Sequence, residues 1–356
     1  MKIFSTFTGI GGFEVGIQNA YGSTIGRSKS NTQKSSGFWQ RLLASARKSI
    51  STKKRSISPG NNNFLDERPL FVGYSEIDKY ATSIYEKQFK GVKNYGDITK
   101  INADELPDFD CLVGGFPCQA FSIAGKRGGF EDTRGTLFFD LARILRAKQP
   151  RLFVFENVKG LLSHDSGATF RTIINTIAEL GYDAEWQVVN SKDYNVPQNR
   201  ERIIIVGHLR GTPTTQVFPL EGSNGNYIKE ITRAVPQAQR VYEKSGIAPS
   251  VDTGQGGNRQ AKIIQRSRGK NNGGVKDIAP TLTGRSYQDN NHLMQEFSLR
   301  RLTPIECERL QAFPDNWTAI GKHDEIMSDT QRYKMCGNAV TTNVVQAVFE
   351  RIFSHL

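Results

Sequence analysis

The feature that most limits how this chain can fold is a regular alternation of apolar runs with amphipathic segments of helical length. Apolar runs occupy residues 3–8, 70–78, 111–116, 152–158, 184–190 and 202–209, and helix-like segments occupy 13–20, 80–89, 137–148 and 168–181. Such alternation is typical of strands that lie parallel and are joined by crossover helices. The sequence therefore predicts an α/β fold, with a doubly wound and mainly parallel sheet over residues 1–210.

A basic insertion interrupts this pattern at about residues 23–70. Its ten Lys and Arg residues outnumber its two acidic ones, Asp66 and Glu67, so it contributes +8 to a total net charge of +12. The composition favours a disordered or partly helical insertion, and a dedicated DNA-contacting element is the alternative. The basic residues are Arg27, Lys29, Lys34, Arg41, Arg47, Lys48, Lys53, Lys54, Arg55 and Arg68.

Beyond residue 210 the chain becomes rich in Gly, Asn, Gln, Thr and Arg, as in the stretches GQGGNRQ and RSRGKNNGG. This composition predicts a second, smaller domain at about 211–325, with short strands and no large core. Helices are expected at 302–313 and 339–353. We expect the segment 326–356 to return to the first domain, because the last helix is apolar enough to dock on a larger body.

Charge and cysteine content indicate the partners and the environment. A net charge of +12 favours a polyanionic partner, since clustered Lys and Arg bind phosphate backbones. No apolar run approaches the roughly 18 residues that span a bilayer, and we expect a cytoplasmic protein. The four cysteines form no CxxC pair, so we expect reduced thiols and neither a disulfide nor a metal site.

Three successive strand ends carry residues suited to an adenosine-containing ligand. The first is followed by the turn FTGIGGF, whose glycines allow the backbone to approach a ligand at a helix N-terminus. The second ends in Glu76, a carboxylate placed to bind ribose hydroxyls, and the third supplies Asp97. These features leave NAD, FAD and S-adenosylmethionine as possible ligands.

The next two strand ends carry a thiol and a carboxylate. In GGFPCQAFS, Cys118 lies at a strand-to-loop turn at the same sheet edge, a position typical of a nucleophile. Cys111 falls inside the preceding apolar strand and is expected in the core, as are Cys307 and Cys336. Glu156, at the end of the following strand, can hold a heteroaromatic base and share a proton with its ring nitrogen.

With these motifs in order, the sequence resembles the DNA (cytosine-5)-methyltransferases of bacterial and phage restriction-modification type. FTGIGGF, SEID and GDI resemble the S-adenosylmethionine motifs of that family, GGFPCQAFS its catalytic loop, and FENV its base-holding motif. YNVPQNRERIIIVG, RRLTPIECERLQAFPDNW and YKMCGNAVTTNVV resemble its later motifs. The resemblance covers nearly the whole chain and implies the Rossmann-like methyltransferase fold with S-adenosylmethionine as cofactor.

The resemblance also implies a mechanism. Cys118 would add to C6 of a flipped-out cytosine, so that C5 attacks the methyl group of S-adenosylmethionine. Loss of the C5 proton and expulsion of the cysteine would then release 5-methylcytosine. Glu156 would hydrogen-bond N3 and the 4-amino group, Arg202 would contact the base carbonyl or the attacking region, and Arg200 would support the pocket or bind phosphate. Residues 119–130 would form a mobile loop that closes over the DNA.

Cofactor contacts are carried over in the same way. Phe13 and Ile77 would enclose the adenine, Glu76 would bind the ribose, and the pair Asp97 and Ile98 would meet the adenine edge. Asn338 and Val340 would lie near the methionine moiety. The remaining cofactor-binding candidates are Phe7, Gly9, Gly11, Gly12 and Pro117.

DNA contacts are expected from the catalytic loop and from the smaller domain, which resembles the target-recognition domain of the family. Arginine reads guanine but also binds phosphate, so the target sequence does not follow from these residues. Ala124 stands where well-known members carry serine, which leaves the gap-filling role beside the flipped base unassigned. The candidates are Gln119, Lys126, Arg127, Arg259, Arg266, Arg268, Thr281, Leu282 and Arg285.

Further expectations concern partners and alternative functions. The implied partners are double-stranded DNA and a cognate restriction endonuclease acting on the same sequence, and we expect a monomer in a prokaryotic or phage-infected cell, associated with the nucleoid. The nearest alternative is a tRNA cytosine-5 methyltransferase of the same fold. A non-enzymatic DNA-binding homologue and a flavin or NAD oxidoreductase are the others.

Overall fold

The structure is a computed structural model that describes residues 1–36, 68–117, 137–213, 216–222, 262–265, 274–276, 279–280, 291–295 and 298–354. Its centre is a six-stranded sheet with the order β2-β1-β3-β4-β7-β5. These strands are β1 (Lys2–Thr6), β2 (Leu70–Ser75), β3 (Cys111–Gly115), β4 (Leu152–Val158), β5 (Tyr182–Asn190) and β7 (Glu201–Leu209).

The sheet is mainly parallel, as the sequence predicts. Strands β2, β1, β3 and β4 pair in parallel, and β7 runs antiparallel between β4 and β5. The carboxyl ends of β2, β1, β3 and β4 therefore share one edge of the sheet. The strand expected before Asp97 is reduced in the structure to a bridge between Tyr74 and Asn94, although the turn that follows still lies beside β2.

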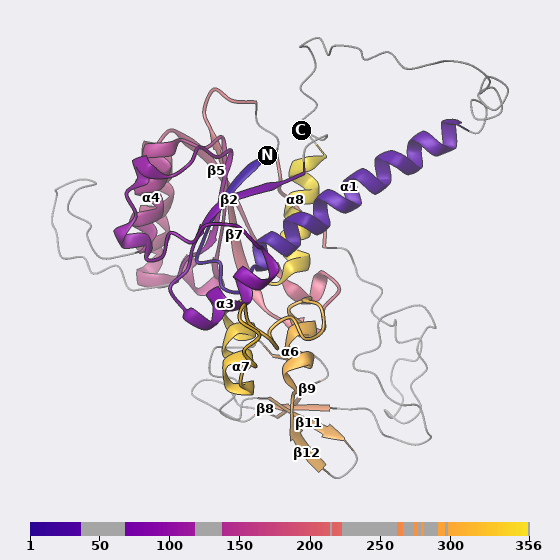
Figure 1. The fold of residues 1–356 in the computed structure, drawn as a ribbon. Coiled ribbons are helices and arrows are strands. Elements are labelled where there is room, and N and C mark those ends of the chain that lie inside the picture. The colour runs from indigo at the N-terminus through magenta and orange to yellow at the C-terminus, as the bar shows by residue number, and fades with distance from the viewer. Residues whose placement is uncertain are drawn as a thin grey trace.

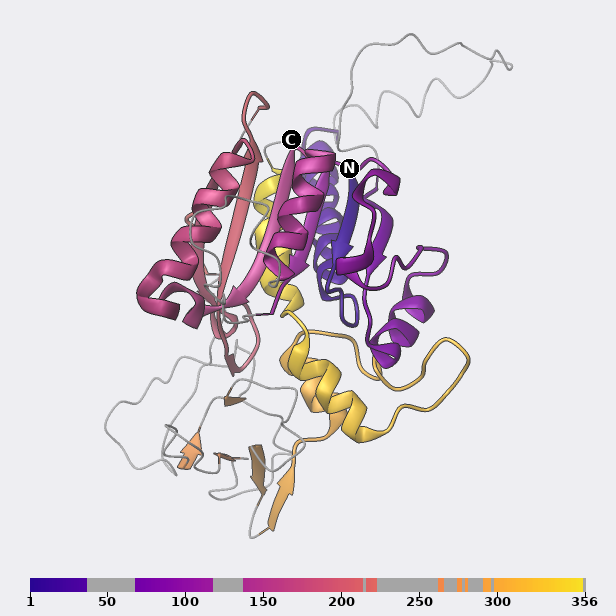
Figure 2. The same ribbon diagram turned by 90° about the vertical axis from the view of Figure 1, so that its left-hand side faces the viewer.

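Helices cover both faces of the sheet (Figures 1 and 2). Helices α1 (Gly12–Ser36) and α8 (Thr342–Phe353) pack on one face, and α4 (Leu137–Lys148) and α5 (Ala168–Glu179) on the other. Ile3 and Phe4 show why both faces are apolar: both are fully buried, and neighbouring strand residues point to opposite sides, so each joins a different core.

Helix α1 is longer than the sequence suggests. It continues to Ser36 and so enters the basic insertion, whose remaining residues 37–67 lie outside the described part of the chain. The helix is held along α8, where Tyr21 packs edge-on against Phe353 at 6.2 Å between ring centroids. The hydroxyl of Ser23 also donates a hydrogen bond to Glu350.

A second body of structure lies beyond the carboxyl edge of the sheet (Figure 1). It contains α6 (Pro304–Leu310) and α7 (Asp329–Asn338), next to α3 (Lys79–Gln88) at the β2 side. The predicted helices at 302–313 and 339–353 correspond to α6 and α8. Short strands precede α6: β6 (Gln198–Asn199) pairs with β10 (Ala279–Pro280), and β8 (Lys262–Gln265), β9 (Gly274–Lys276), β11 (Asn291–Gln295) and β12 (Ser298–Arg301) form a second sheet.

The domain boundaries at 210 and 325 stay predictions, but the packing of the chain around them is informative. Phe313 and Met327 share a buried cluster with Ile10 of the first loop and Tyr85 of α3. Val217 and neighbouring residues join the core beneath α8. The stretches next to both boundaries are therefore packed on the large sheet domain.

The three described cysteines are buried in apolar surroundings. Cys111 is 0% exposed, Cys307 is 2% exposed and Cys336 is 0% exposed, which confirms their expected core positions. Burial raises the pKa of each thiol, so none of them is a thiolate at neutral pH. Within the described ranges, no helix has the length and apolarity to cross a membrane, and no cluster of His, Cys, Asp and Glu is suited to a metal ion.

Glu14 is an ionisable group buried in the first turn of α1. It is 0% exposed and accepts a hydrogen bond from the Tyr85 hydroxyl at 3.0 Å. Burial raises its pKa from the ordinary 4.5 to about 6, although hydrogen bonds oppose the shift. The folded protein therefore holds the proton of Glu14 more tightly than the unfolded chain does, and stability from this group is lost as pH rises from 4.5 through 6.

We predict that Glu14→Gln removes this pH dependence, because a neutral amide keeps the Tyr85 hydrogen bond without a buried charge. The variant should gain about 2 kcal/mol over wild type between pH 4 and pH 7.5, since one pKa unit corresponds to about 1.4 kcal/mol. Urea unfolding at both pH values measures this difference. A stability difference that is the same at the two pH values would contradict the prediction.

Candidate active site

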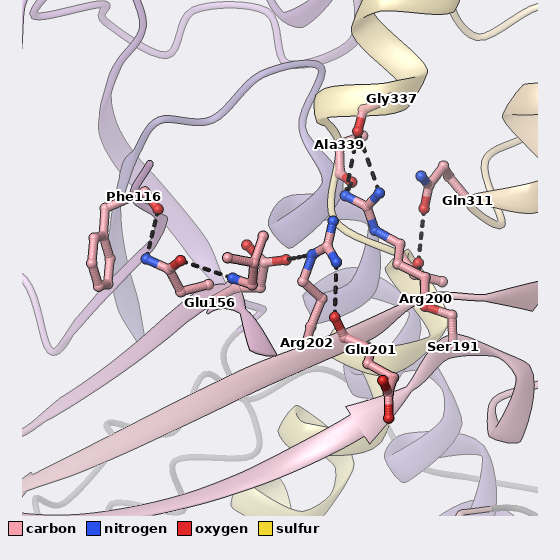
Figure 3. Close-up of polar contacts among 12 residues, drawn as sticks. Phe116, Glu156, Ser191, Arg200, Glu201, Arg202, Gln311, Gly337 and Ala339 are labelled. Atoms are coloured by element: carbon pink, nitrogen blue, oxygen red, sulfur yellow. Dashed lines mark hydrogen bonds and ion pairs between the residues drawn. The ribbon is translucent and has the colours of Figure 1, made fainter. Parts of the chain in front are cut away.

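Glu156 and Arg202 form a buried ion pair at the carboxyl edge of the sheet (Figure 3). Glu156 lies near the end of β4 and Arg202 at the start of β7, where the antiparallel register places Arg202 opposite Val158. Arg202 Nε lies 2.8 Å from Glu156 Oε1, and the two side chains are only 16% and 12% exposed. The structure thus brings two of the predicted catalytic residues together, with the carboxylate beside a positive charge.

The backbone leading to Cys118 is fixed to the residue after Glu156. Asn157 is 2% exposed, and its Nδ2 donates a hydrogen bond to the carbonyl of Phe116 at 3.0 Å. Pro117, which follows, is exposed, and Cys118 lies outside the described residues. Asn157 belongs to the FENV motif, but sequence reasoning assigned it no role. A buried amide at a strand end is the signal that points to it.

The position of the Glu156 carboxylate beside β3 also depends on Gly115. A Cβ atom at this position would lie 3.1 Å from Glu156 Oε2, closer than side chains normally pack. The absence of a side chain therefore lets the carboxylate lie against the strand that leads to Cys118.

Arg200 makes its hydrogen bonds to backbone carbonyls near the end of α7. It is 3% exposed, and its guanidinium donates to the carbonyls of Gly337 at 3.4 Å and Ala339 at 2.9 Å. Burial, together with the positive charge of Arg202, lowers its pKa to about 9, so it stays charged at neutral pH. Of the two roles predicted for Arg200, these contacts favour support of the pocket over phosphate binding.

A chain of buried hydrogen bonds lies beside the contact between Arg200 and the end of α7. The hydroxyls of Ser191 and Thr341 lie 2.8 Å apart, and Thr341 donates to Gln311 Oε1 at 2.8 Å. Gln311 Nε2 in turn donates to the carbonyl of Cys336 at 3.0 Å. The start of α8 and the end of α7 are thus tied to the segment between β5 and β7. Sequence reasoning missed this network because it joins residues far apart in the chain.

The first loop and Glu76 form a cradle that fits a ribose and its neighbours. Gly9 has φ +54°, and space beside its Cα is open to 4 Å. Its N–H donates to Glu76 Oε2 at 2.8 Å, and the N–H groups of Ile77 and Asp78 donate to Glu76 Oε1 at 2.9 and 2.8 Å. Glu76 is therefore a carboxylate locked by three backbone donors beside open space, which suits hydroxyl recognition.

Burial disfavours Phe13 as the residue that encloses the adenine together with Ile77. Phe13 is 3% exposed and packs in the core with Ile3 and Ile17, so it has no face for a ligand. Ile77 itself is 75% exposed. Phe7, at the end of β1, is only half-buried and has φ +51°, a strained conformation for a bulky residue and one that is found at functional sites.

The other predicted cofactor residues differ in burial and contacts. Asp97 caps a short 3-10 turn through a hydrogen bond from the N–H of Thr99, and Ile98 is buried beneath it. Asn338 is exposed at the end of α7 and Val340 is half-buried. Gly11 and Gly12 have protein atoms beside their Cα atoms, from Phe89 and Val340, so these two glycines allow close packing within the protein.

The predicted DNA contacts lie outside the described residues, as does the loop at 118–136. The structure therefore does not place Gln119, Lys126, Arg127, Arg259, Arg266, Arg268, Thr281, Leu282, Arg285 or Ala124.

Comparison with known proteins agrees with this geometry. Residues 70–354 match the family described as C-5 cytosine-specific DNA methylase. The type II methyltransferase M1.ScrFI of Lactococcus lactis subsp. cremoris is 40% identical over 82% of this chain and 74% of its own. M.HhaI of Haemophilus parahaemolyticus is 36% identical over 79% of this chain and 87% of its own.

A solved structure supports the fold. The Dnmt2 methyltransferase of S. pombe aligns over 100% of this chain and 98% of its own with a TM-score of 0.59, at 15% identity. The chain thus belongs to the C-5 cytosine-specific DNA methylases. It is a DNA (cytosine-5-)-methyltransferase of restriction-modification type that uses S-adenosylmethionine and acts on DNA.

We predict that Asn157→Ala loosens the backbone before Cys118. The buried Phe116 carbonyl loses its donor, which should lower the free energy of unfolding by about 1–3 kcal/mol and reduce kcat by about tenfold. Urea unfolding and single-turnover methylation measure the two effects. Asn102→Ala removes an exposed asparagine that caps a 3-10 turn, and it should leave turnover unchanged. Wild-type turnover in Asn157→Ala would contradict the proposed anchoring.

Proposed function

We propose that Cys118 is the nucleophile that adds to C6 of a flipped-out cytosine in duplex DNA. Support comes from the described cysteines, which are buried and hold their protons, so none of them is suited to attack. The backbone at Phe116 and Pro117 runs beside Glu156 and is anchored there by Asn157. Attack on C6 moves electron density toward C5 and N3, where it must be stabilised.

The Glu156–Arg202 ion pair is the observation that carries this proposal. Glu156 accepts a hydrogen bond from the 4-amino group of the base, and it takes up a proton from solvent that it shares with N3 as charge develops there. Arg202 Nε fixes one carboxylate oxygen, and its Nη1 donates to the Glu201 carbonyl at 2.8 Å. Its Nη2 makes no hydrogen bond to the described residues, and we assign it to the carbonyl oxygen of the base.

The cofactor site is proposed along the neighbouring strand ends. When bound, S-adenosylmethionine supplies an electrophilic methyl group. Glu76 binds the ribose hydroxyls, Phe7 replaces Phe13 as the partner of Ile77 beside the adenine, and Asp97 meets the adenine edge. The remaining assignments keep the predicted roles, which are those of Gly9, Ile98, Pro117, Asn338 and Val340.

We predict that Cys118→Ala abolishes transfer of tritiated methyl groups to duplex DNA. Glu156→Gln should reduce kcat by about 100-fold or more, because the amide cannot supply the proton and leaves Arg202 unpaired. DNA that contains 5-fluorocytosine should trap a covalent complex with wild type and none with Cys118→Ala.

Robust methyl transfer by Cys118→Ala would show that Cys118 is not the nucleophile. Bisulfite sequencing of DNA from expressing cells reads the target sequence.

The alternative substrate to be compared with duplex DNA is tRNA. A tRNA cytosine-5 methyltransferase would use the same cysteine and glutamate, so the two activities are separated by presenting duplex DNA and tRNA side by side. We expect transfer to DNA, in agreement with the family and the relatives. The cognate endonuclease, the monomeric state and the cytoplasmic location stay predictions.

The basic insertion provides a further test of DNA binding. We predict that deletion of residues 37–67, which leaves α1 intact, weakens binding mainly at low salt, because the removed Lys and Arg residues neutralise phosphates. Binding constants measured across a salt series give the slope for each protein. A slope equal to that of wild type would exclude a DNA-binding role for this segment.

A further inference from the structure

Two side chains from the C-terminal part of the chain contact the two turns that form the proposed cofactor site. Trp317 Nε1 donates to the carbonyl of Ile10 at 2.9 Å, and Lys334 Nζ donates to Asp78 Oδ2 at 2.7 Å. We propose that Trp317 and Lys334 are positioning residues that hold these turns in the shape that binds S-adenosylmethionine. The inference rests on the cofactor site proposed above.

Trp317 fixes the glycine turn at its centre. Ile10 stands between Gly9 and Gly11, which both have positive φ, so its carbonyl belongs to a short stretch with unusual backbone angles. The indole is itself held by packing on Phe313 at 5.5 Å and on Phe89 at 6.1 Å between ring centroids. A rigid donor on the Ile10 carbonyl restricts the turn to one of the conformations that glycine allows.

Lys334 fixes the acidic turn through Asp78. The Asp78 side chain caps α3 by accepting from the N–H groups of Tyr80 and Ala81, and the N–H of Asp78 donates to Glu76 Oε1. Burial alone would raise the pKa of Asp78, but the bond from Lys334 and those from the backbone outweigh it and lower that pKa. The same bond raises the pKa of Lys334, so both groups are charged at neutral pH.

The contacts of Trp317 and Lys334 act on two turns that are joined to each other through Glu76. Gly9 of the first turn donates to Glu76 Oε2, and Asp78 of the second turn donates to Glu76 Oε1, so the carboxylate joins the turns. Trp317 and Lys334 hold this frame from outside, and neither touches Glu76 directly in the structure. Pre-organisation of this kind improves ligand affinity because less ordering remains for the binding step.

The test measures binding of S-adenosylmethionine by isothermal titration calorimetry in the absence of DNA. Trp317→Phe keeps an aromatic ring but loses the indole N–H and some packing volume, a loss that Trp186→Phe matches, and Lys334→Met loses the charge. Each should raise the Kd by about three- to tenfold, the range for one hydrogen bond or one partly exposed ion pair. Lys334→Arg should restore most of the affinity. The kcat at saturating cofactor should stay within about twofold of wild type while KM for the cofactor rises.

Matched controls separate positioning from general loosening of the structure. Lys87→Met breaks the 2.7 Å pair between Lys87 and Asp324, which also joins α3 to the C-terminal segment but touches neither cofactor turn. Trp186→Phe changes a half-exposed tryptophan on β5 that packs on Phe170. Both should bind the cofactor as wild type does. Thermal unfolding without ligand should be similar for all variants.

Different outcomes would overturn the positioning role and the cofactor site on which it rests. Unchanged Kd values in Trp317→Phe and Lys334→Met, with wild type binding normally, would overturn the positioning role. A loss of affinity in Lys87→Met equal to that in Lys334→Met would overturn it as well. Failure of wild type to bind S-adenosylmethionine would instead reject the cofactor site on which the inference rests.

Discussion

The buried guanidinium of Arg200 joins two parts of the chain that are 137 residues apart in sequence. A cation at 3% exposure is tolerated only where acceptors replace its lost water, and the carbonyls of Gly337 and Ala339 do so. These carbonyls lie at the end of α7, where an α-helix leaves carbonyl groups without partners of its own. The contact therefore gives hydrogen-bond partners both to the guanidinium of Arg200 and to the carbonyls at the end of α7. It also fixes α7 and the start of α8 against the sheet.

The residues of the candidate active site lie close in the sequence to the residues of this contact or to their strand partners. Arg202 stands two residues after Arg200, at the start of β7, and its pairing with β4 brings its guanidinium to Glu156. The residue after Glu156 anchors the backbone that leads to Cys118. One arginine thus contacts backbone carbonyls and the other contacts the carboxylate of Glu156, although the two stand only two residues apart.

Much of the fold was predictable because strands and helices leave a periodic pattern of apolar residues. The pattern did not reveal that α1 continues to Ser36, since that stretch is polar. It also suggested a strand before Asp97 where the structure has one bridge. In the site, Glu156 and Arg202 were predicted by motif, whereas the burial of Phe13 was not, because a glycine turn does not show which of its flanking aromatic rings faces inward.

The sequence by itself determined the fold class, the family and the order of the site residues along the chain, because local periodicity and motif spacing are written in it directly. Tertiary structure alone decided which arginine meets Glu156, that Asn157 holds the backbone before Cys118, and that Trp317 and Lys334 reach the cofactor turns. Trp317 and Ile10 are 307 positions apart. Contacts of this kind depend on how strands and helices pack, and no local pattern encodes that packing.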